Sequence, residues 1–194
     1  MTLSWNASGL LPPIAPGEHP AGWNRSPYLT TLAEVADFFV TTNARLNIFR
    51  GFVNYRKALH DIGICKGFQW LNGSFVEQVE MTRHKPPNDS DVVTFAYLPQ
   101  DCKNQSDLYN KNPNLFDRAI AKAKFQVDGY MMVLGDLMTA EAVRRIAYWY
   151  SLWSHQRDTY AWKGFIQLDL SLDTDKYTDD ILKMKEEELR HESC

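Results

Sequence analysis

The stretch NDSDVVTFAYLP (residues 88–99) contains the clearest strand of the sequence. Residues 92–98 are rich in β-branched and aromatic side chains, and Pro99 closes the run because proline cannot donate a hydrogen bond within a sheet. Side chains alternate between the two faces of a strand, so Asp89 and Asp91 should share one face, with Ser90 on the other. The stretch therefore predicts a strand that begins with two carboxylates pointing the same way.

Three further strands and four helices follow from the residue pattern. Strands are predicted over residues 64–71, which run into the turn sequence Asn72-Gly73-Ser74, and over residues 125–134 and 164–172. Apolar residues recur at three- and four-residue steps behind four capping residues, Thr31, Asn43, Asn112 and Thr139, and each of these is predicted to begin a helix. The expected buried face of the third helix is Phe116, Ala119, Ile120 and Ala123. The order of elements predicts an α+β fold, a small mixed sheet flanked by helices.

The chain of 194 residues is predicted to form one domain with an arm and a tail. Residues 1–30 hold five prolines among apolar residues and should lie as an extended arm on the domain. The domain itself spans residues 31–172. Residues 173–194 are strongly charged and are interpreted as a solvated terminal helix, with a partner-binding helix as the alternative.

Composition sets limits on location and partners. The sequence has no run of about 20 apolar residues and no basic-then-apolar leader, so we expect a cytoplasmic protein with no membrane partner. Its net charge of -3 gives no general attraction to nucleic acid, and an RNA partner would need a local basic patch. The three cysteines are far apart and are expected to be reduced thiols. Walker, dinucleotide and nucleophile-elbow motifs are absent from the sequence, which gives kinase-like, dehydrogenase and hydrolase functions no support.

A third acidic residue, Asp128, lies within the predicted strand 125–134. If this strand is a neighbour of the strand that begins with Asp89 and Asp91, three carboxylates converge on one point. Such convergence is unfavourable without a cation, and Mg²⁺ accepts a few carboxylate oxygens while leaving positions for water and phosphate. Asp128 would also lie close to an acceptor hydroxyl as a general base. The sequence thus predicts an Mg²⁺ site formed by Asp89, Asp91 and Asp128.

Other residues are candidates for contact with phosphate. Gly73 and Ser74 follow a predicted strand, where backbone N–H groups and a hydroxyl can approach the terminal phosphates of a nucleotide. Arg157 and Lys163 lie in the loop before the last strand and can neutralise the charge of a leaving phosphate group. We therefore assign these four residues to nucleotide binding.

Each of these features also has a structural interpretation. An Asp-x-Asp that follows Pro-Pro-Asn is typical of a turn and cap, and a Gly-Ser turn is common. Asp128 alone fits a structural residue that is hydrogen-bonded to a neighbouring loop. The combination of all three in this order, each on the element that the chemistry requires, favours the functional interpretation.

These motifs resemble a known signature. Leu71-Asn72-Gly73-Ser74, Asp89-Ser90-Asp91-Val92 and Val127-Asp128 together look like the pattern of the polymerase-β-like nucleotidyltransferase superfamily: Gly-Ser, a loop, Asp-x-Asp, and a distant third acid. Residues 70–75, Tyr148-Trp149 and Trp162-Lys163-Gly164 are similar to an uncharacterised family of small bacterial and phage nucleotidyltransferase-like proteins, over most of the chain. The stretch between Ser74 and Asp89 is slightly longer than is usual in the superfamily. This departure bears on the shape of the phosphate pocket more than on the metal ligands.

The resemblance implies a minimal nucleotidyltransferase fold, two Mg²⁺ ions and a nucleoside triphosphate such as ATP as substrate. The implied reaction transfers a nucleotide to a hydroxyl of RNA, including transfer RNA, or of protein, and releases pyrophosphate. Small relatives of this type act in toxin–antitoxin and anti-phage systems, which implies a cognate partner protein. The alternative function is a catalytically inactive binding or regulatory module that keeps the fold and holds a partner in its groove.

Overall fold

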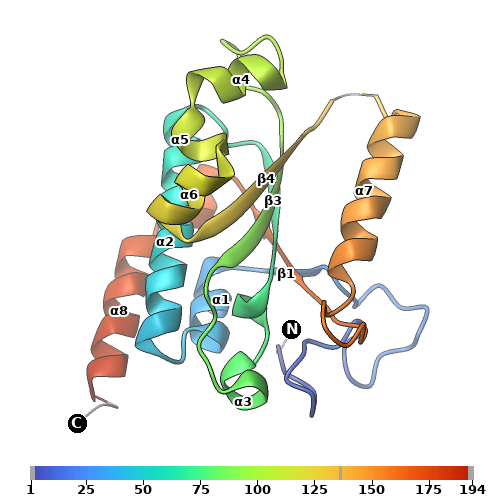
Figure 1. Ribbon diagram of the computed structural model, residues 1–194, viewed down its shortest axis with the longest axis vertical. Helices are drawn as coiled ribbons and strands as arrows, with labels where there is room; N and C mark the ends of the chain where they lie inside the picture. Colours follow the sequence, from blue (N-terminus) through green and yellow to red (C-terminus); the bar gives the residue numbers. More distant parts are fainter. Residues whose placement is uncertain (1–2, 136, 192–194) are drawn as a thin grey trace.

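The computed structural model describes residues 3–135 and 137–191 as a five-stranded mixed sheet with helices on both faces (Figure 1). The strands are β1 (Tyr28–Thr30), β2 (Gly67–Asn72), β3 (Ser90–Ala96), β4 (Val127–Val133) and β5 (Ile166–Asp169), in the order β1-β5-β2-β3-β4. β1 and β4, at the edges, run parallel to their neighbours β5 and β3, whereas β2 in the middle is antiparallel to both of its neighbours. The predicted α+β fold is confirmed.

Within residues 3–135 and 137–191, eight helices and two 3-10 turns accompany the sheet. The helices are α1 (Leu32–Phe39), α2 (Asn43–Asp61), α3 (Val79–Arg83), α4 (Gln105–Lys111), α5 (Pro113–Phe116), α6 (Arg118–Phe125), α7 (Ala140–Trp153) and α8 (Thr178–His191); the 3-10 turns are η1 (Ser74–Val76) and η2 (Leu172–Asp175). None of these helices, in the described ranges, combines the length and the apolar character needed to cross a bilayer.

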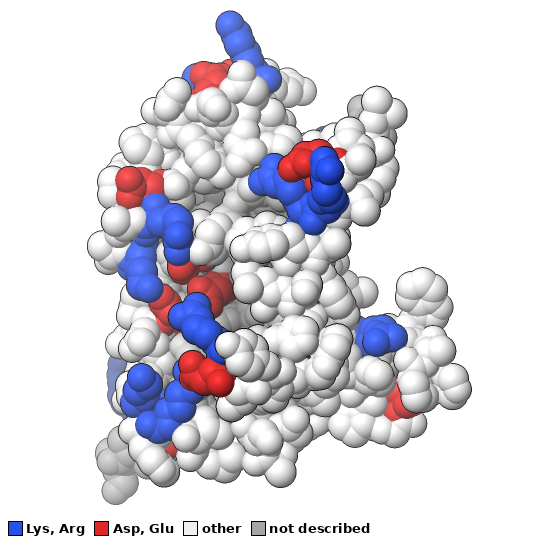
Figure 2. Space-filling view, turned by 45° about the vertical axis from the view of Figure 1, so that its right-hand side comes forward, with Lys and Arg blue, Asp and Glu red and all other residues white. Residues whose placement is uncertain are grey.

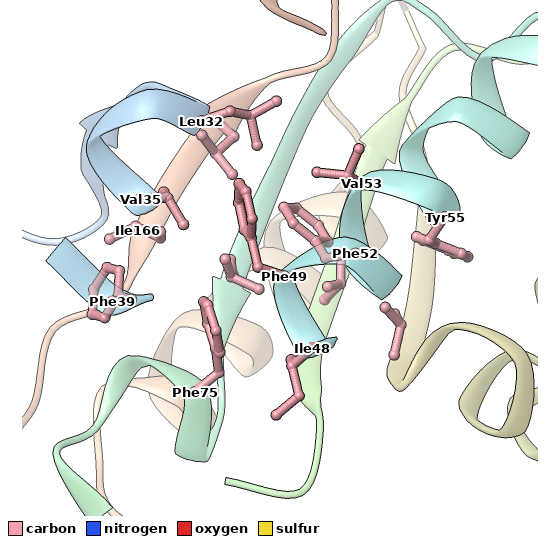
Figure 3. Close-up of a cluster of buried hydrophobic side chains, with 14 of the residues drawn as sticks. Leu32, Val35, Phe39, Ile48, Phe49, Phe52, Val53, Tyr55, Phe75 and Ile166 are labelled. Atoms are coloured by element: carbon pink, nitrogen blue, oxygen red, sulfur yellow. The ribbon is translucent and has the colours of Figure 1, made fainter. Parts of the chain in front are cut away.

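The two faces of the sheet are covered unequally. α1, α2, α6 and α8 lie together on one side, whereas α7 stands alone on the other (Figure 1). Phe49, Phe52 and Val53 of α2 meet α1 and the sheet in the larger core, as Figure 3 shows. Under α7, Trp153 packs with Phe165 and with Val93 and Phe95 of β3 in a smaller cluster. This second cluster identifies the face of the sheet on which the candidate site lies.

Local signals fix the ends of several helices. The Thr31 side chain accepts a hydrogen bond from the Glu34 backbone while the Glu34 side chain accepts one from the Thr31 backbone, as a capping box requires. Thr139 caps α7 as predicted. For α2, the prediction that Asn43 is the cap is wrong. Thr42 is the N-cap, since its hydroxyl accepts a hydrogen bond from the Arg45 backbone, and Asn43 is already helical.

The segment after Asn112 differs from the expected single helix. Asp117 accepts a hydrogen bond from the Ile120 backbone and so caps a new helix, α6, separate from α5. The restart changes the helical phase, because Ala121 and Phe125 are buried while Ala119, Ile120 and Ala123 are exposed. The predicted buried face was therefore wrong for α6, and this change of phase turns other α6 side chains toward the sheet edge.

The arm and the tail are both built into the domain. In the arm, Leu10 and Leu11 are buried, and the Gly164 backbone donates a hydrogen bond to the Leu11 carbonyl. In the tail, α8 packs against α1 and α2 and buries Leu182 in the larger core. Asp175 receives the fully buried Arg56 guanidinium at 2.6 Å. The charged C-terminal segment is thus helical as predicted, but one side of it is core rather than solvated.

Candidate functional site

Three side chains lie in a row across the sheet. Asp91 of β3 pairs in register with Asn72 of β2 on one side and with Asp128 of β4 on the other. Residues at the same register on adjacent strands project to the same face. Val93 of β3 packs in the cluster under α7, and side chains two residues apart on a strand share a face. The row therefore lies on the face of the sheet that α7 covers, and Asp89, two residues before Asp91, belongs to the same side. The condition for convergence, that β3 and β4 be neighbours, is therefore met.

The row opens into a cleft of about 950 Å³, within the usual size range for small-molecule sites. The three predicted carboxylates line it, and so do Gly73 and Ser74. Six basic side chains also line it: Arg83, Lys85, Arg118, Lys122, Arg157 and Lys163. Figure 2 shows acidic side chains recessed among basic ones along the left-hand side of one face of the molecule. The cleft combines an acidic floor with basic walls.

Asp91 is the electrostatic centre of the cleft. Burial first, and then the charges of Asp89 and Asp128, raise its pKa to about 6, against the opposing effect of Lys163 and Arg157. The three carboxylates are thus close enough to repel one another. A carboxyl group that is buried among like charges fits a place where a cation binds.

Gly73 allows the turn after β2 to pass directly over Asp91. Its φ of 82° and ψ of -166° lie in a region that is essentially restricted to glycine. A Cβ atom at this position would lie 2.3 Å from Asp91 Oδ2. The predicted turn is confirmed, although η1 is a single turn and too short for the accumulated dipole of a helix to hold an anion.

We expect Gly73→Ala to distort the Asp91 side chain and to lower the free energy of unfolding by about 2–3 kcal/mol, from backbone strain and overlap together. The measurement is urea denaturation followed by tryptophan fluorescence. Gly17→Ala is the matched control, because Gly17 has a similar φ of 83° but open space where a Cβ would lie. Equal losses of unfolding free energy in the two variants would show that overlap with Asp91 does not contribute.

Two of the three carboxylates hold cations from α6. Arg118 donates from Nε and Nη2 to the two oxygens of Asp128 at 2.8 and 2.7 Å, and its guanidinium lies 4.7 Å from the centre of the Tyr130 ring. Lys122 forms an ion pair with Asp89. Neither Arg118 nor Lys122 was predicted from the sequence, yet their four-residue spacing behind the Asp117 cap is a signal that could have found them.

Lys163 lines the cleft as predicted, but its ammonium is already paired. Lys163 Nζ lies 2.5 Å from Glu77 Oε1, and Gln156 and Arg83 each donate to Glu77 Oε2 at 3.1 Å. Burial lowers the pKa of Lys163, while Glu77 acts to raise it. Glu77 was missed in the sequence, where it lies 86 positions from Lys163 and belongs to no motif. Arg157 lines the same wall and acts on the pKa of Asp91.

Asn72 offers an acceptor that the protein itself does not use. Its Nδ2 donates to the Trp153 carbonyl at 3.1 Å, which fixes the amide in the wall of the cleft. Within residues 3–135 and 137–191, no group donates a hydrogen bond to the buried Oδ1. Buried polar atoms are normally satisfied, so this oxygen, beside Asp91, is suited to a ligand donor or a cation.

The donor chemistry fits Mg²⁺, but the side chains do not form a ready site. Carboxylate and amide oxygens are the ligands that Mg²⁺ prefers, and Asp89, Asp91, Asp128 and Asn72 supply them. As the described residues stand, no group of three or more His, Cys, Asp and Glu side chains could hold a metal ion. Two of these carboxylates, Asp128 and Asp89, are instead paired with Arg118 and Lys122. The residues fit the ion only if these two cations move.

Comparison with known proteins places the chain in a family. Residues 3–169 match a family described as of unknown function, DUF6932. The match begins in the N-terminal arm and extends to the end of β5, so it covers the whole sheet and the cleft. No curated protein and no solved structure matches the chain. The description names no activity, and the resemblance to nucleotidyltransferases stays a prediction. The chain is a member of the DUF6932 family.

Proposed function

We propose that this protein is an Mg²⁺-dependent nucleotidyltransferase that moves a nucleotide from a nucleoside triphosphate to a hydroxyl of RNA or protein. The observation that carries the proposal is the register of Asn72, Asp91 and Asp128 across three adjacent strands, with Asp89 beside them, at the floor of a cleft with basic walls. An acidic floor suits a divalent cation, and basic walls suit a triphosphate.

The chain's own residues divide the work by position. Asp89, Asp91 and Asp128, with the Asn72 amide oxygen, would hold Mg²⁺, which supplies neutralisation of phosphate charge when it is bound. Gly73 lets the backbone approach the phosphates, and Ser74 offers a hydroxyl beside them. Arg157 and the Glu77-anchored Lys163, which line the same cleft, would neutralise the phosphates that leave.

The proposed step is an in-line displacement. The acceptor oxygen forms a bond to the α-phosphorus as the bond from that phosphorus to the bridging oxygen of the β-phosphate breaks, so pyrophosphate leaves with the bonding electron pair. Asp128 takes the proton of the acceptor hydroxyl as general base. We also propose a cytoplasmic location, with which the free thiols of Cys65 and Cys102 are compatible.

One observation favours a second function. Arg118 and Lys122 neutralise Asp128 and Asp89 without any metal, so the acidic floor is compatible with a structural role. In that case the protein is an inactive binding or regulatory module, and the cleft holds a partner. The two functions differ in one measurable respect: only the first requires a divalent cation and a triphosphate to bind together.

The test is binding and transfer of a labelled nucleotide. We expect the wild-type protein to bind a non-hydrolysable triphosphate in the presence of Mg²⁺ and to transfer label from α-³²P triphosphates to cellular RNA or protein. Asp89→Asn should reduce transfer by about a hundred- to a thousandfold, the typical cost of losing one group that stabilises transition-state charge. Chromatography of labelled RNA and gel electrophoresis of labelled protein separate the two acceptor classes.

Asp61→Asn is the matched control, because Asp61 is exposed at the end of α2 and does not line the cleft. It should bind and transfer like the wild type. Absence of triphosphate binding with Mg²⁺ in a folded wild-type preparation would contradict the enzymatic proposal. A partner bound equally well by wild type and Asp89→Asn, without metal, would support the second function.

A further inference from the structure

Helix α6 presents two cations to the cleft from consecutive turns. Arg118 and Lys122 are four residues apart, so they lie on the same side of the helix. Their side chains are 59% and 55% exposed, whereas those of the carboxylates they hold, Asp128 and Asp89, are only 15% and 14% exposed. Each cation therefore reaches in from solvent to a carboxylate that is fixed in the floor.

The cations use the oxygens that a metal ion would need. Arg118 engages both oxygens of Asp128, a bidentate arrangement that leaves little of the carboxylate for another cation. Binding of Asp89 to Lys122 has the same effect at the second ligand. An ion that enters the floor must displace at least one of these contacts, and the displaced side chain then carries an uncompensated positive charge beside the cleft.

A triphosphate supplies the compensation. Both side chains line the cleft, and their exposed, flexible stems can turn toward its opening without movement of α6. A guanidinium that fits a carboxylate through two parallel hydrogen bonds fits a phosphate in the same way. Tyr130, which lies under the Arg118 guanidinium, remains a surface on which the side chain can pivot.

We propose that Arg118 and Lys122 are exchangeable counterions, which hold Asp128 and Asp89 in the metal-free protein and transfer to the phosphates when metal and triphosphate bind. This inference rests on the proposed function. Its consequence is coupling: the metal binds weakly alone because it must displace the cations, and more tightly with triphosphate because the displaced cations have new partners. By linkage, the metal must strengthen triphosphate binding by the same factor.

The test measures Mn²⁺ affinity by electron paramagnetic resonance, with and without a non-hydrolysable triphosphate. For the wild type we expect the triphosphate to tighten Mn²⁺ binding by about tenfold or more beyond the Mn²⁺ affinity of the triphosphate itself, within the usual range of coupling between sites. In Arg118→Met and Lys122→Met, Mn²⁺ alone should bind about five- to tenfold more tightly, and the added effect of triphosphate should shrink to a few fold.

Three controls keep the outcomes distinct. Lys124→Met removes a neighbouring α6 cation that lies over the Phe125 ring and does not line the cleft, so it should behave like the wild type. Lys122→Arg keeps the charge and should preserve the coupling, whereas Arg118→Lys keeps the charge without the two parallel hydrogen bonds and should preserve only part of it. Thermal unfolding of each variant confirms that it is folded.

Unchanged Mn²⁺ affinity in Arg118→Met and Lys122→Met would overturn the exchange. If Mn²⁺ binding is nevertheless lost in Asp91→Asn, the proposed metal site stands. If the wild type and both methionine variants bind no Mn²⁺ with or without triphosphate, the metal site fails and the exchange fails with it. Tighter Mn²⁺ binding in the methionine variants together with reduced triphosphate coupling supports the exchange.

Discussion

Asp91→Asn should make the metal-free protein more stable at pH 7, by about 3 kcal/mol, while it removes metal binding. The pKa of Asp91 rises from 3.8 to about 6 in the folded protein, and each pKa unit corresponds to about 1.4 kcal/mol. The cause is first the burial of the carboxyl group and then the charges of Asp89 and Asp128. An amide is uncharged, so the variant avoids this repulsion. A site that is destabilising when empty is typical of a functional position.

The direction of the pH dependence follows from the raised pKa. Well below pH 3.8, the ordinary pKa of the group, the carboxyl group is protonated in both the folded and the unfolded chain, so Asp91 does not penalise folding. As pH rises through about 6, the unfolded chain has already lost this proton, and the folded protein loses it against burial and repulsion. Wild-type stability should therefore fall between pH 4 and pH 6 relative to the Asp91→Asn variant.

Urea denaturation of both proteins at pH 4, 5, 6 and 7, in the presence of a chelator, measures this difference. Asp61→Asn again serves as the control, since an exposed carboxylate should change stability by less than about 0.5 kcal/mol at every pH. A stability difference for Asp91→Asn that is the same at pH 4 and pH 7 would contradict the electrostatic origin. Loss of stability at pH 7 would show that the carboxylate makes a stabilising contact.

Glu77→Gln should destabilise the protein by about 3–5 kcal/mol, because it leaves the Lys163 ammonium buried without an opposite charge. Only 5% of the Lys163 side chain and 6% of the Glu77 side chain are exposed, so water cannot replace the lost partner. The change also weakens the hold on Arg83 and Gln156, which donate to the same carboxylate. The cleft wall that faces Asp91 should therefore lose its order together with the stability.

A double-mutant cycle isolates this pair. Glu77→Gln combined with Lys163→Met removes both charges and should recover most of the loss, since replacing both partners of a buried pair costs much less than removing one. Glu141→Gln is the control, because Glu141 forms an exposed pair with Arg144 and should cost less than about 1 kcal/mol. Chemical denaturation gives all the values. If the losses of stability from the two substitutions simply add, the contact between Glu77 and Lys163 is not what stabilises the cleft wall.

Much of the secondary structure could be predicted because its causes are local. The capping box of Thr31 and Glu34 lies within four residues, and the alternation that places Asp89 and Asp91 on one side depends only on the strand they begin. The turn at Gly73 was predictable for the same reason. Where a local signal was overlooked, as with the Asp117 cap, the helical phase and the buried face of α6 were wrong.

The meeting of the site residues could not be predicted in this way. Whether Asp128 lies beside Asp91 depends on which strands pair, and that depends on the burial of both sheet faces and not on either strand alone. The contact of Glu77 with Lys163 spans 86 positions, and no pattern in either segment indicates it. The tail gave no local sign that α8 would cover α1 and α2, because its apolar edge is thin.

By itself, then, the sequence determined four of the described strands, the helices that begin near Thr31, Asn43 and Thr139, and the face on which each carboxylate projects, since backbone preferences and side-chain alternation act over a few residues. The edge strand β1 and the short helices α3 and α4 were not predicted. Only the tertiary structure decided that Asn72, Asp91 and Asp128 share one row, and that Arg118, Lys122 and Lys163 surround it. The physical reason is that packing brings together groups from segments far apart along the chain, and the energies that select this packing are summed over the whole core.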